Sequence, residues 1–310
     1  AQVVQNVSEG RPISKTDRKL LRELEAEFAD ELSQIGTQVA QPPRWHVYPV
    51  RSRTSNGVYA WRADDNYLVV DPIAKLGLRY KTAGVGSAAG RILTTVGGIM
   101  LRGSLRGSLG FYLNTRDTQH RGNKPFSSPT DLSGKHAPPI MHWESQNSVS
   151  YDQTDAYLTL SCRWFQLEFG KQFHDWGPGY WGNLTLSNYA PSFEALKIKA
   201  RYGHWKFVWL TGALRTDLPE YSYNAPYSNT PRKVRKQKYI AAHRLEFAPH
   251  PRIAVGINEA IIYGERGIEP GYLIPTMFFW SEQHYIYGDD NATIGADIAA
   301  YPLKGLKLYS

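Results

Sequence analysis

The sequence predicts an all-β transmembrane protein, an antiparallel β-barrel preceded by a short N-terminal amphipathic helix. Three observations predict this fold. Candidate strands alternate apolar and polar residues over about ten residues or more, which suits tilted strands that cross a membrane. Short and long connections alternate between these strands. Tyr and Trp, which gather at membrane–water interfaces, are abundant, with 20 Tyr and 9 Trp among 310 residues.

The first 43 residues contain the one convincing helical pattern. Leu20, Leu24, Phe28 and Leu32 recur at helical spacing, and Pro42 ends the segment. An amphipathic helix of about 20 residues needs a surface to pack on. The mouth of the barrel or a small helical bundle would provide it. We therefore expect residues 1–43 to form a periplasmic helical segment and residues 44–310 to form the barrel.

About 13 strands are predicted after Pro43. Their bounds are 45–51, 58–62, 67–81, 91–103, 105–116, 149–162, 163–172, 195–203, 205–216, 238–248, 252–264, 292–301 and 306–310. Single-chain bacterial barrels have an even number of strands, and an open edge in lipid would leave backbone groups unsatisfied. We therefore expect the natural protein to continue beyond Ser310; a miscounted strand is the competing explanation.

The connections predict a topology. Short ones fall at residues 104, 162–163, 203–204, 249–251 and 302–305, and long ones at 117–148, 173–194, 217–237 and 265–291. This is the pattern of tight periplasmic turns and extended external loops in outer-membrane barrels. No apolar run approaches the roughly 18 residues of a membrane helix, so we expect strands to make the crossing. An outer-membrane location further requires that a signal peptide has already been removed before Ala1.

Positive charge concentrates on the polar sides of the predicted strands. Lys197, Lys199 and Arg201 alternate with apolar residues, and Arg106 lies on the polar side of strand 105–116. With a net charge of +8, we expect a basic lumen and an anionic partner. The alternative is the solvated face of a soluble sheet. The basic run 231–238 fits lipopolysaccharide phosphates or acidic glycans better than nucleic acid, although a merely solvated loop is an equal alternative.

The most unusual segment contains the turn Trp176-Gly177-Pro178-Gly179, followed by Tyr180 and Trp181. Proline fixes its own φ while the flanking glycines permit positive φ, so the turn is stiff. Aromatic rings beside polar groups suit the C–H faces of sugars. We therefore expect an external glycan-binding loop, with Trp176, Tyr180 and Trp181 beside Lys197, Lys199, Arg201 and Arg106. A structural plug or an aromatic girdle is the alternative.

Motifs of enzymes are missing from the sequence. It has no nucleophile elbow, phosphate-binding loop, dinucleotide fingerprint or zinc-protease motif. His174-Asp175 and the Glu282/His284 pair offer too few ligands for a metal site. Glu246 and Glu259 are expected to pair with luminal Arg and Lys. We expect no catalytic residues, no metal and no cofactor.

Three blocks of residues resemble the capsule assembly Wzi family of outer-membrane barrels. The first is the 176–179 turn with Leu186-Ser187 and Ala190-Pro191-Ser192-Phe193. The second is 242–247 with 249–252 and Asn258-Glu259-Ala260, and the third contains 273–275, 281–283 and 288–291. The resemblance covers residues 170–310 well, and 43–151 only by strand pattern.

The resemblance implies a barrel of about 18 strands with a periplasmic helical element. It also implies a non-enzymatic protein that behaves as a lectin and holds capsular polysaccharide at the cell surface. The partners would be an anionic surface polysaccharide, outer-membrane lipid or lipopolysaccharide, and other envelope proteins, without nucleic acid. An anion-selective porin, or a scaffold subunit of a larger assembly, would use the same features.

Overall fold

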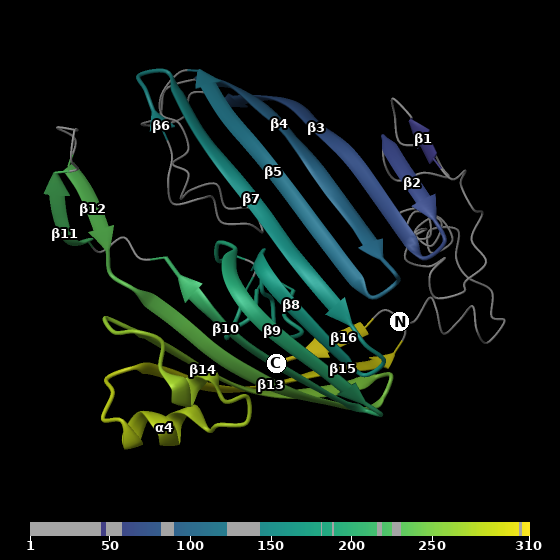
Figure 1. Cartoon of the computed structure of the whole chain (residues 1–310), viewed down its shortest axis with the longest axis vertical. Helices are drawn as coiled ribbons and strands as arrows, with labels where there is room; N and C mark the ends of the chain where they lie inside the picture. The colour runs from purple at the N-terminus through teal and green to yellow at the C-terminus, as the bar shows by residue number, and fades with distance from the viewer. Residues whose placement is uncertain are drawn as a thin grey trace. The chain divides into compact units, whose positions relative to one another are not determined.

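Antiparallel β-strands dominate the computed structural model (Figure 1). The structure describes residues 45–47, 58–81, 90–122, 143–180, 182–187, 189–215, 219–224, 231–303 and 306–310. Every pairing given between strands in these ranges is antiparallel. The chain divides into two compact units between Ser161 and Cys162. The all-β antiparallel class predicted from the sequence is confirmed. The N-terminal helix predicted within residues 1–43 lies outside the described residues.

The first unit is a sheet of long neighbouring strands. In chain order they are β1 (Trp45–Val47), β2 (Tyr59–Ala63), β3 (Asn66–Lys81), β4 (Gly90–Leu105), β5 (Leu109–Gly122), β6 (Trp143–Glu144) and β7 (Ser148–Ser161). The strands from β1 to β5 pair consecutively, β5 pairs with β7, and β6 pairs with β7. Strands of 14 to 16 residues in β3, β4, β5 and β7 are long for a soluble sheet.

The second unit continues the same architecture. Its strands are β8 (Phe165–Gln172), β9 (Phe193–Tyr202), β10 (Trp205–Leu214), β13 (Lys238–His250), β14 (Ile253–Gly264), β15 (Asn291–Leu303) and β16 (Leu306–Tyr309), each paired with the next. A separate hairpin of β11 (Pro219–Asn224) and β12 (Pro231–Arg235) lies between β10 and β13 in sequence. The 3₁₀ helix η1 (Pro270–Leu273) and the helix α4 (Phe279–Tyr285) lie between β14 and β15. Neither helix in the described ranges is long and apolar enough to cross a membrane.

Most predicted strands occur within a few residues of their expected bounds, and the differences have local causes. The turn expected at Ser104 lies at residues 106–108, because Arg106 and Gly107 take up the two positive φ angles that a tight hairpin needs. Arg106 is therefore in a turn, and its predicted place on the polar side of a strand is wrong. The predicted long loops contain β6, the β11–β12 hairpin, η1 and α4, whose short segments have weak sequence patterns.

Each unit has one side that exposes large apolar residues. Cross-strand partners point to the same side of a sheet. In the first unit Leu105, Leu109 and Leu160 are partners across β4, β5 and β7, and all three are exposed. In the second unit the exposed Ile257 and Ile294 share a side, which we call the apolar face. Apolar side chains exposed over many strands mark a surface that meets lipid or protein.

The other side of the second unit, the polar face, carries Glu168, Lys197, Arg244, Asn258 and Asp297. Both faces have a buried hydrophobic cluster. Leu210, Ala242 and Ala260 belong to the cluster on the polar face, and their chain neighbours Trp209, Ala241 and Ile261 to the cluster on the apolar face. Successive strand residues point to opposite sides of the sheet. Because residues on both sides are buried here, other segments of the chain cover each side of this sheet locally.

Candidate functional site

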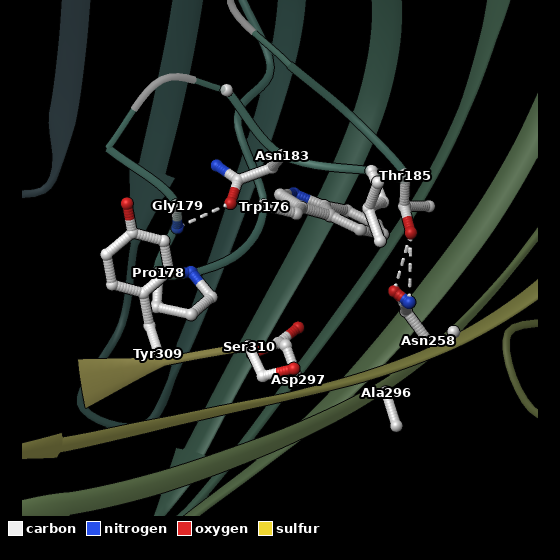
Figure 2. A pocket seen from close by; sticks show the side chains of 13 residues that line it. Trp176, Pro178, Gly179, Asn183, Thr185, Asn258, Ala296, Asp297, Tyr309 and Ser310 are labelled. Carbon is white, nitrogen blue, oxygen red and sulfur yellow. Dashed lines mark hydrogen bonds between the residues drawn. The ribbon is translucent and has the colours of Figure 1, made fainter.

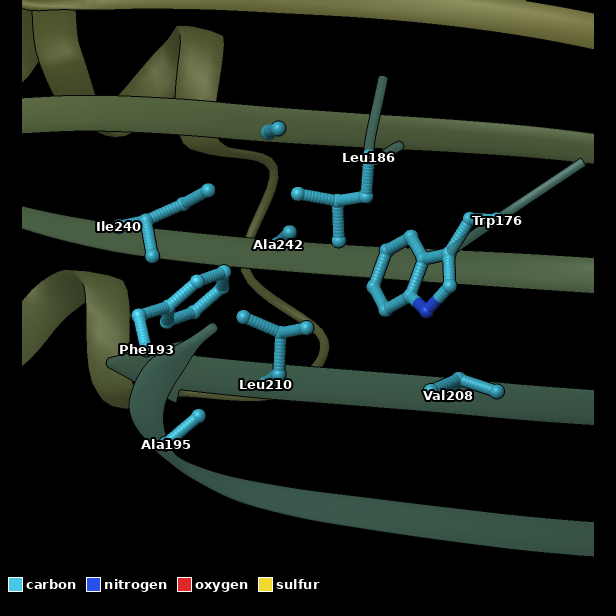
Figure 3. Packing of buried hydrophobic residues seen from close by; sticks show 9 residues of the cluster. Trp176, Leu186, Phe193, Ala195, Val208, Leu210, Ile240 and Ala242 are labelled. Carbon is cyan, nitrogen blue, oxygen red and sulfur yellow. The ribbon is translucent and has the colours of Figure 1, made fainter. Parts of the chain in front are cut away.

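The β8–β9 loop folds across the polar face of the second unit. Its described residues are 173–180, 182–187 and 189–192. The backbone of Trp176 pairs with that of Leu186, with 2.9 Å between Trp176 N and Leu186 O. Both side chains are buried against Val208, Leu210 and their neighbours, as Figure 3 shows. The cluster consists of Trp176, Leu186, Phe193, Ala195, Val208, Leu210, Ile240, Ala242 and Ala260.

The Trp-Gly-Pro-Gly turn is shaped by one asparagine. Asn183 Oδ1 accepts a hydrogen bond from the backbone N–H of Gly179 at 2.8 Å, and Asn183 Nδ2 donates to Asp175 Oδ1 at 2.6 Å. Gly177 has a φ of 132°, which favours glycine. A Cβ at Gly177 would also overlap the Asn183 side chain. The two glycines therefore let the turn close around Asn183.

Two polar contacts fasten the loop to the sheet. Thr185 Oγ1 donates to Asn258 Oδ1 at 2.7 Å, and the Asn258 amide lies 3.0 Å from Thr185 Oγ1. Lys307 Nζ donates to the carbonyl oxygen of Pro178 at 2.5 Å. Gly295, opposite Asn258 in the register, leaves the space that the Asn258 amide occupies. Asn258 of β14 and Lys307 of β16 thus bind the loop, and Gly295 of β15 leaves room for the Asn258 amide.

A pocket of about 200 Å³ lies between the loop and the sheet. Figure 2 shows its wall of Trp176, Pro178 and Asn183 from the loop, facing Asp297 and Tyr309 from β15 and β16. Its lining mixes rings, amides and hydroxyls with one carboxylate. The complete lining is Trp176, Pro178, Gly179, Gly182, Asn183, Leu184, Thr185, Asn258, Gly295, Ala296, Asp297, Tyr309 and Ser310.

Beside the loop, Glu168 holds two lysines on the polar face. Lys197 and Lys199 both form ion pairs with the Glu168 carboxylate, and Gln172 Nε2 donates to it at 2.9 Å. The Lys197 side chain is 8% exposed and the Glu168 side chain 4%, whereas that of Lys199 is 34% exposed. Buried charges are tolerated when they are paired and hydrogen-bonded. Because the single negative charge of Glu168 balances only one of the two lysines, the three groups together keep a net positive charge.

A second ionic cluster centres on the buried Arg244. Its guanidinium donates to both oxygens of Asp297, at 2.5 and 2.8 Å, and to Glu246 at 2.8 Å. Lys206 adds an ion pair to Glu246 at 3.0 Å. Arg244 reaches Asp297 across β14, because Gly256 has no side chain at the point where the guanidinium passes.

His174 lies at the start of the loop, and its ring packs on that of Phe193 with 4.4 Å between centroids. Burial, reinforced by the positive charge of Lys197, lowers the pKa of His174 to about 4. The imidazole is therefore neutral at pH 7. Its neutrality allows it to pack beside Lys197 without adding a third buried positive charge.

The loop residues predicted to bind glycan are found in different environments. Trp176 is only 9% exposed and packs in the hydrophobic cluster, although it also lines the pocket. Tyr180 is 64% exposed, whereas Trp181 lies outside the described residues. Gly177, Pro178 and Gly179 form the expected stiff turn. Because Trp176 anchors the loop, it does not offer an open ring to a sugar.

The predicted basic residues are not gathered into one site. Lys197 and Lys199 share Glu168, as described above. Arg201 is exposed near the tight turn after β9, and the exposed Arg106 belongs to a turn of the other unit. Their role in binding glycan stays a prediction.

Several residues that build the site were not predicted as site residues. Asn183 acts through contacts within its own loop, with Gly179 and Asp175. Thr185 and Asp297 act through contacts with distant parts of the chain; Thr185 and Asn258 are 73 positions apart. Alternation in β14 does assign Asn258 to the polar face, and the same alternation assigns Glu259 to the apolar face. Glu246 pairs with Lys206 and Arg244 as expected. The luminal partner expected for Glu259 is wrong, because that carboxylate pairs with His243 on the apolar face.

A comparison with models of protein families identifies one relevant family, described as capsule assembly protein Wzi. The match spans residues 103–295, more than half of the chain, and includes the β8–β9 loop and both ionic clusters apart from Asp297. Comparisons with curated proteins and with solved structures give no match. The family resemblance seen in the sequence motifs is confirmed. This chain belongs to the capsule assembly protein Wzi family.

Proposed function

We propose that this chain is a non-enzymatic outer-membrane β-barrel protein that holds capsular polysaccharide at the cell surface. Family membership supports a role in capsule assembly. The exposed apolar residues of both units support a lipid-facing exterior. In lipid an open sheet edge would leave backbone N–H and C=O groups unsatisfied, and a sheet avoids such edges by closing into a barrel. The mature chain would then carry its polar face toward the lumen.

The β8–β9 loop is the observation that carries the proposal. A channel needs a polar face that is open to water, whereas here a long connection covers part of that face in the second unit and is fixed there. Two buried side chains, the Thr185–Asn258 hydrogen bonds and the Lys307–Pro178 contact hold it down. A covered lumen suits a protein that retains a polymer at its surface better than one that conducts ions.

The loop also offers groups suited to sugar. Tyr180 is exposed on a loop whose turn is stiffened by Pro178 and Asn183, so its ring can stack on a pyranose at a low entropic cost. The exposed Arg201 and the half-exposed Lys199 are the predicted cations with most access to a polyanion. The buried Lys197 would contribute mainly to structure.

A capsule-retention experiment tests this function. The gene is deleted in an encapsulated strain that carries it, and cell-bound and released polysaccharide are measured by a uronic acid assay. We expect deletion to move polysaccharide into the medium and the wild-type gene to restore retention. Tyr180→Ala should restore it only in part, whereas Pro191→Ala, an exposed change in the same loop outside the pocket, should restore it fully. Unchanged retention in the deletion strain would overturn the proposal.

Reconstitution in planar bilayers tests the covered lumen separately. The full chain should give no large steady currents, while a double variant that releases the loop, Thr185→Val with Asn258→Leu, should give measurable ones. Large steady currents from the wild type would favour the anion-selective channel instead.

A further inference from the structure

The connection between β14 and β15, residues 265–290, folds back over the apolar face of the second unit. Figure 1 shows α4 beside β14. Tyr272 of η1 and Phe279 of α4 are fully buried, and they pack on Trp209, Ala241 and Ile261. All three are residues of the apolar face. We call residues 265–290 the covering segment.

A buried carboxylate explains why the segment stays there. Glu259 lies on the apolar face, where it is 3.2 Å from His243 Nε2. It accepts hydrogen bonds from the backbone N–H groups of Phe279 at 3.0 Å and Trp280 at 2.7 Å, the first two residues of α4. The Phe279 ring also lies 4.6 Å from that of His243. A carboxylate facing hydrocarbon costs about 2.5–3.5 kcal/mol. The covering segment removes the Glu259 carboxylate from hydrocarbon, and the carboxylate in turn accepts the first two N–H groups of α4.

Polar contacts close the base of the segment. Arg266 donates to both oxygens of Asp290, at 2.9 and 2.5 Å, and the Tyr272 hydroxyl donates to the same carboxylate at 2.8 Å. Gln283 Nε2 donates to the carbonyl oxygen of Asp290 at 2.6 Å. The two ends of the segment are thus tied to each other and to η1 and α4.

The outward side of this fixed segment is aromatic. Phe278 and Trp280 are each 50% exposed, Tyr285 is 80% exposed and Tyr287 94%. A segment held by buried polar contacts does not need four exposed aromatic rings for its own stability. On the sheet itself, the exposed Ile257 and Ile294 continue this surface on the same face.

We propose that the covering segment anchors the protein in the headgroup layer of the outer leaflet through these aromatic rings. Trp and Tyr favour the boundary between headgroups and acyl chains. The segment joins the ends of β14 and β15 that carry long connections, which is the external end of the predicted topology. The inference rests on the membrane barrel proposed above and adds a lipid contact that polysaccharide retention does not require.

Site-specific fluorescence quenching tests the anchor. In a Cys162→Ser background, single cysteines at Tyr285, Ile257 or Leu184 are labelled with bimane, and the full chain is reconstituted in phosphatidylcholine–phosphatidylglycerol vesicles. Nitroxide lipids labelled at the headgroup or deep in the acyl chain serve as quenchers. We expect headgroup nitroxide to quench the label at 285 at least twofold more than deep nitroxide does. For the label at 257 we expect the reverse, with deep nitroxide quenching at least twofold more. The label at 184, on the polar face, should resist both.

The outcomes separate this inference from the proposed function. Deep quenching at 257 without quenching at 285 would overturn the anchor and leave the membrane barrel standing. A label at 285 that neither nitroxide lipid quenches, together with crosslinking between copies, would also overturn it, in favour of a second copy on this surface. If neither the label at 257 nor a second one at Ile294 is quenched, the membrane barrel itself is wrong.

Discussion

Two long connections of the second unit lie on opposite faces of one sheet. The β8–β9 loop places Trp176 and Leu186 on the polar face, and the covering segment places Tyr272 and Phe279 on the apolar face. The loop is fastened by hydrogen bonds between the uncharged side chains of Thr185 and Asn258 and by the contact of Lys307 with the Pro178 carbonyl. The covering segment is fastened by a buried carboxylate that its own backbone satisfies.

The difference follows from what each face would meet without its cover. On a polar face water can replace the lost hydrogen bonds, so releasing the loop costs little beyond its hydrophobic contacts. On an apolar face Glu259 would keep only His243 as a partner among the residues that the structure describes, in surroundings that solvate charge poorly. The covering segment should therefore be the harder of the two to release.

Replacing Glu259 should have the largest effect. In Glu259→Ala the first two N–H groups of α4 lose their acceptor, and we expect the segment to loosen by about 2–5 kcal/mol, since each buried donor left unsatisfied costs about 1–3 kcal/mol. Hydrogen exchange at the amides of Phe279 and Trp280, measured by mass spectrometry in nanodiscs, would report the loss. Exchange in the β8–β9 loop should not change.

A matched control exists on the same segment. Glu265 is an exposed carboxylate paired with Lys236 at 2.5 Å, so Glu265→Ala should change exchange by less than about 1 kcal/mol. If the two variants behave alike, Glu259 does not hold the segment, and the comparison between the two faces fails.

The fold and the two faces were predictable because a strand reports its orientation residue by residue. Lys197 and Lys199 alternate with Leu196 and Ile198, and the structure places these pairs on opposite sides. Glu259 shows how far this signal extends. It stands between Ile257 and Ile261, so alternation alone assigns it to the apolar face, although its charge led to the opposite expectation.

The covers themselves were not predictable from local sequence. The residue before α4, Phe278, makes no side-chain capping hydrogen bond. Glu259 caps the helix instead, by accepting the N–H of Phe279 from a position 20 residues earlier in the chain. A helix of seven residues capped from another strand carries almost no local signal. The fixed position of the β8–β9 loop likewise depends on Asn258, far from Thr185 in sequence.

A smaller effect is expected at the turn of the β8–β9 loop. Gly177→Ala would strain a φ of 132° and push on Asn183, so we expect the loop to loosen by about 1–3 kcal/mol. Limited proteolysis between 173 and 192 would measure it. As a control, Gly97→Ala introduces a Cβ with open space around it and should be neutral. Equal protease resistance in wild type and Gly177→Ala would show that the turn is not needed to hold the loop.

Acid should also release the loop. The pKa of His174 is about 4 in the folded protein and 6.5 ordinarily, so the released loop binds more protons between these values. The contribution of His174 to the loop's stability is nearly complete from about pH 7 upward, falls by about 2 kcal/mol on going from pH 7 to pH 5, and levels off below pH 4. Proteolysis with an acid-tolerant protease should follow this course. His174→Phe should flatten it, and an unchanged pH profile in that variant would assign the effect to another group.

The smallest effect is expected at Lys199, where the polar face meets the proposed ligand. Lys199→Gln leaves Glu168 paired with Lys197 and hydrogen-bonded to Gln172, so stability should fall by less than about 1 kcal/mol. Lys197→Gln should cost more, because Lys197 is the more buried partner. In binding of purified capsular polysaccharide to the full chain, we expect Lys199→Gln to lower affinity less than threefold. A tenfold loss would mean that the polymer displaces Glu168 from Lys199. This ion pair would then open when the ligand binds, and would not serve only to stabilise the fold.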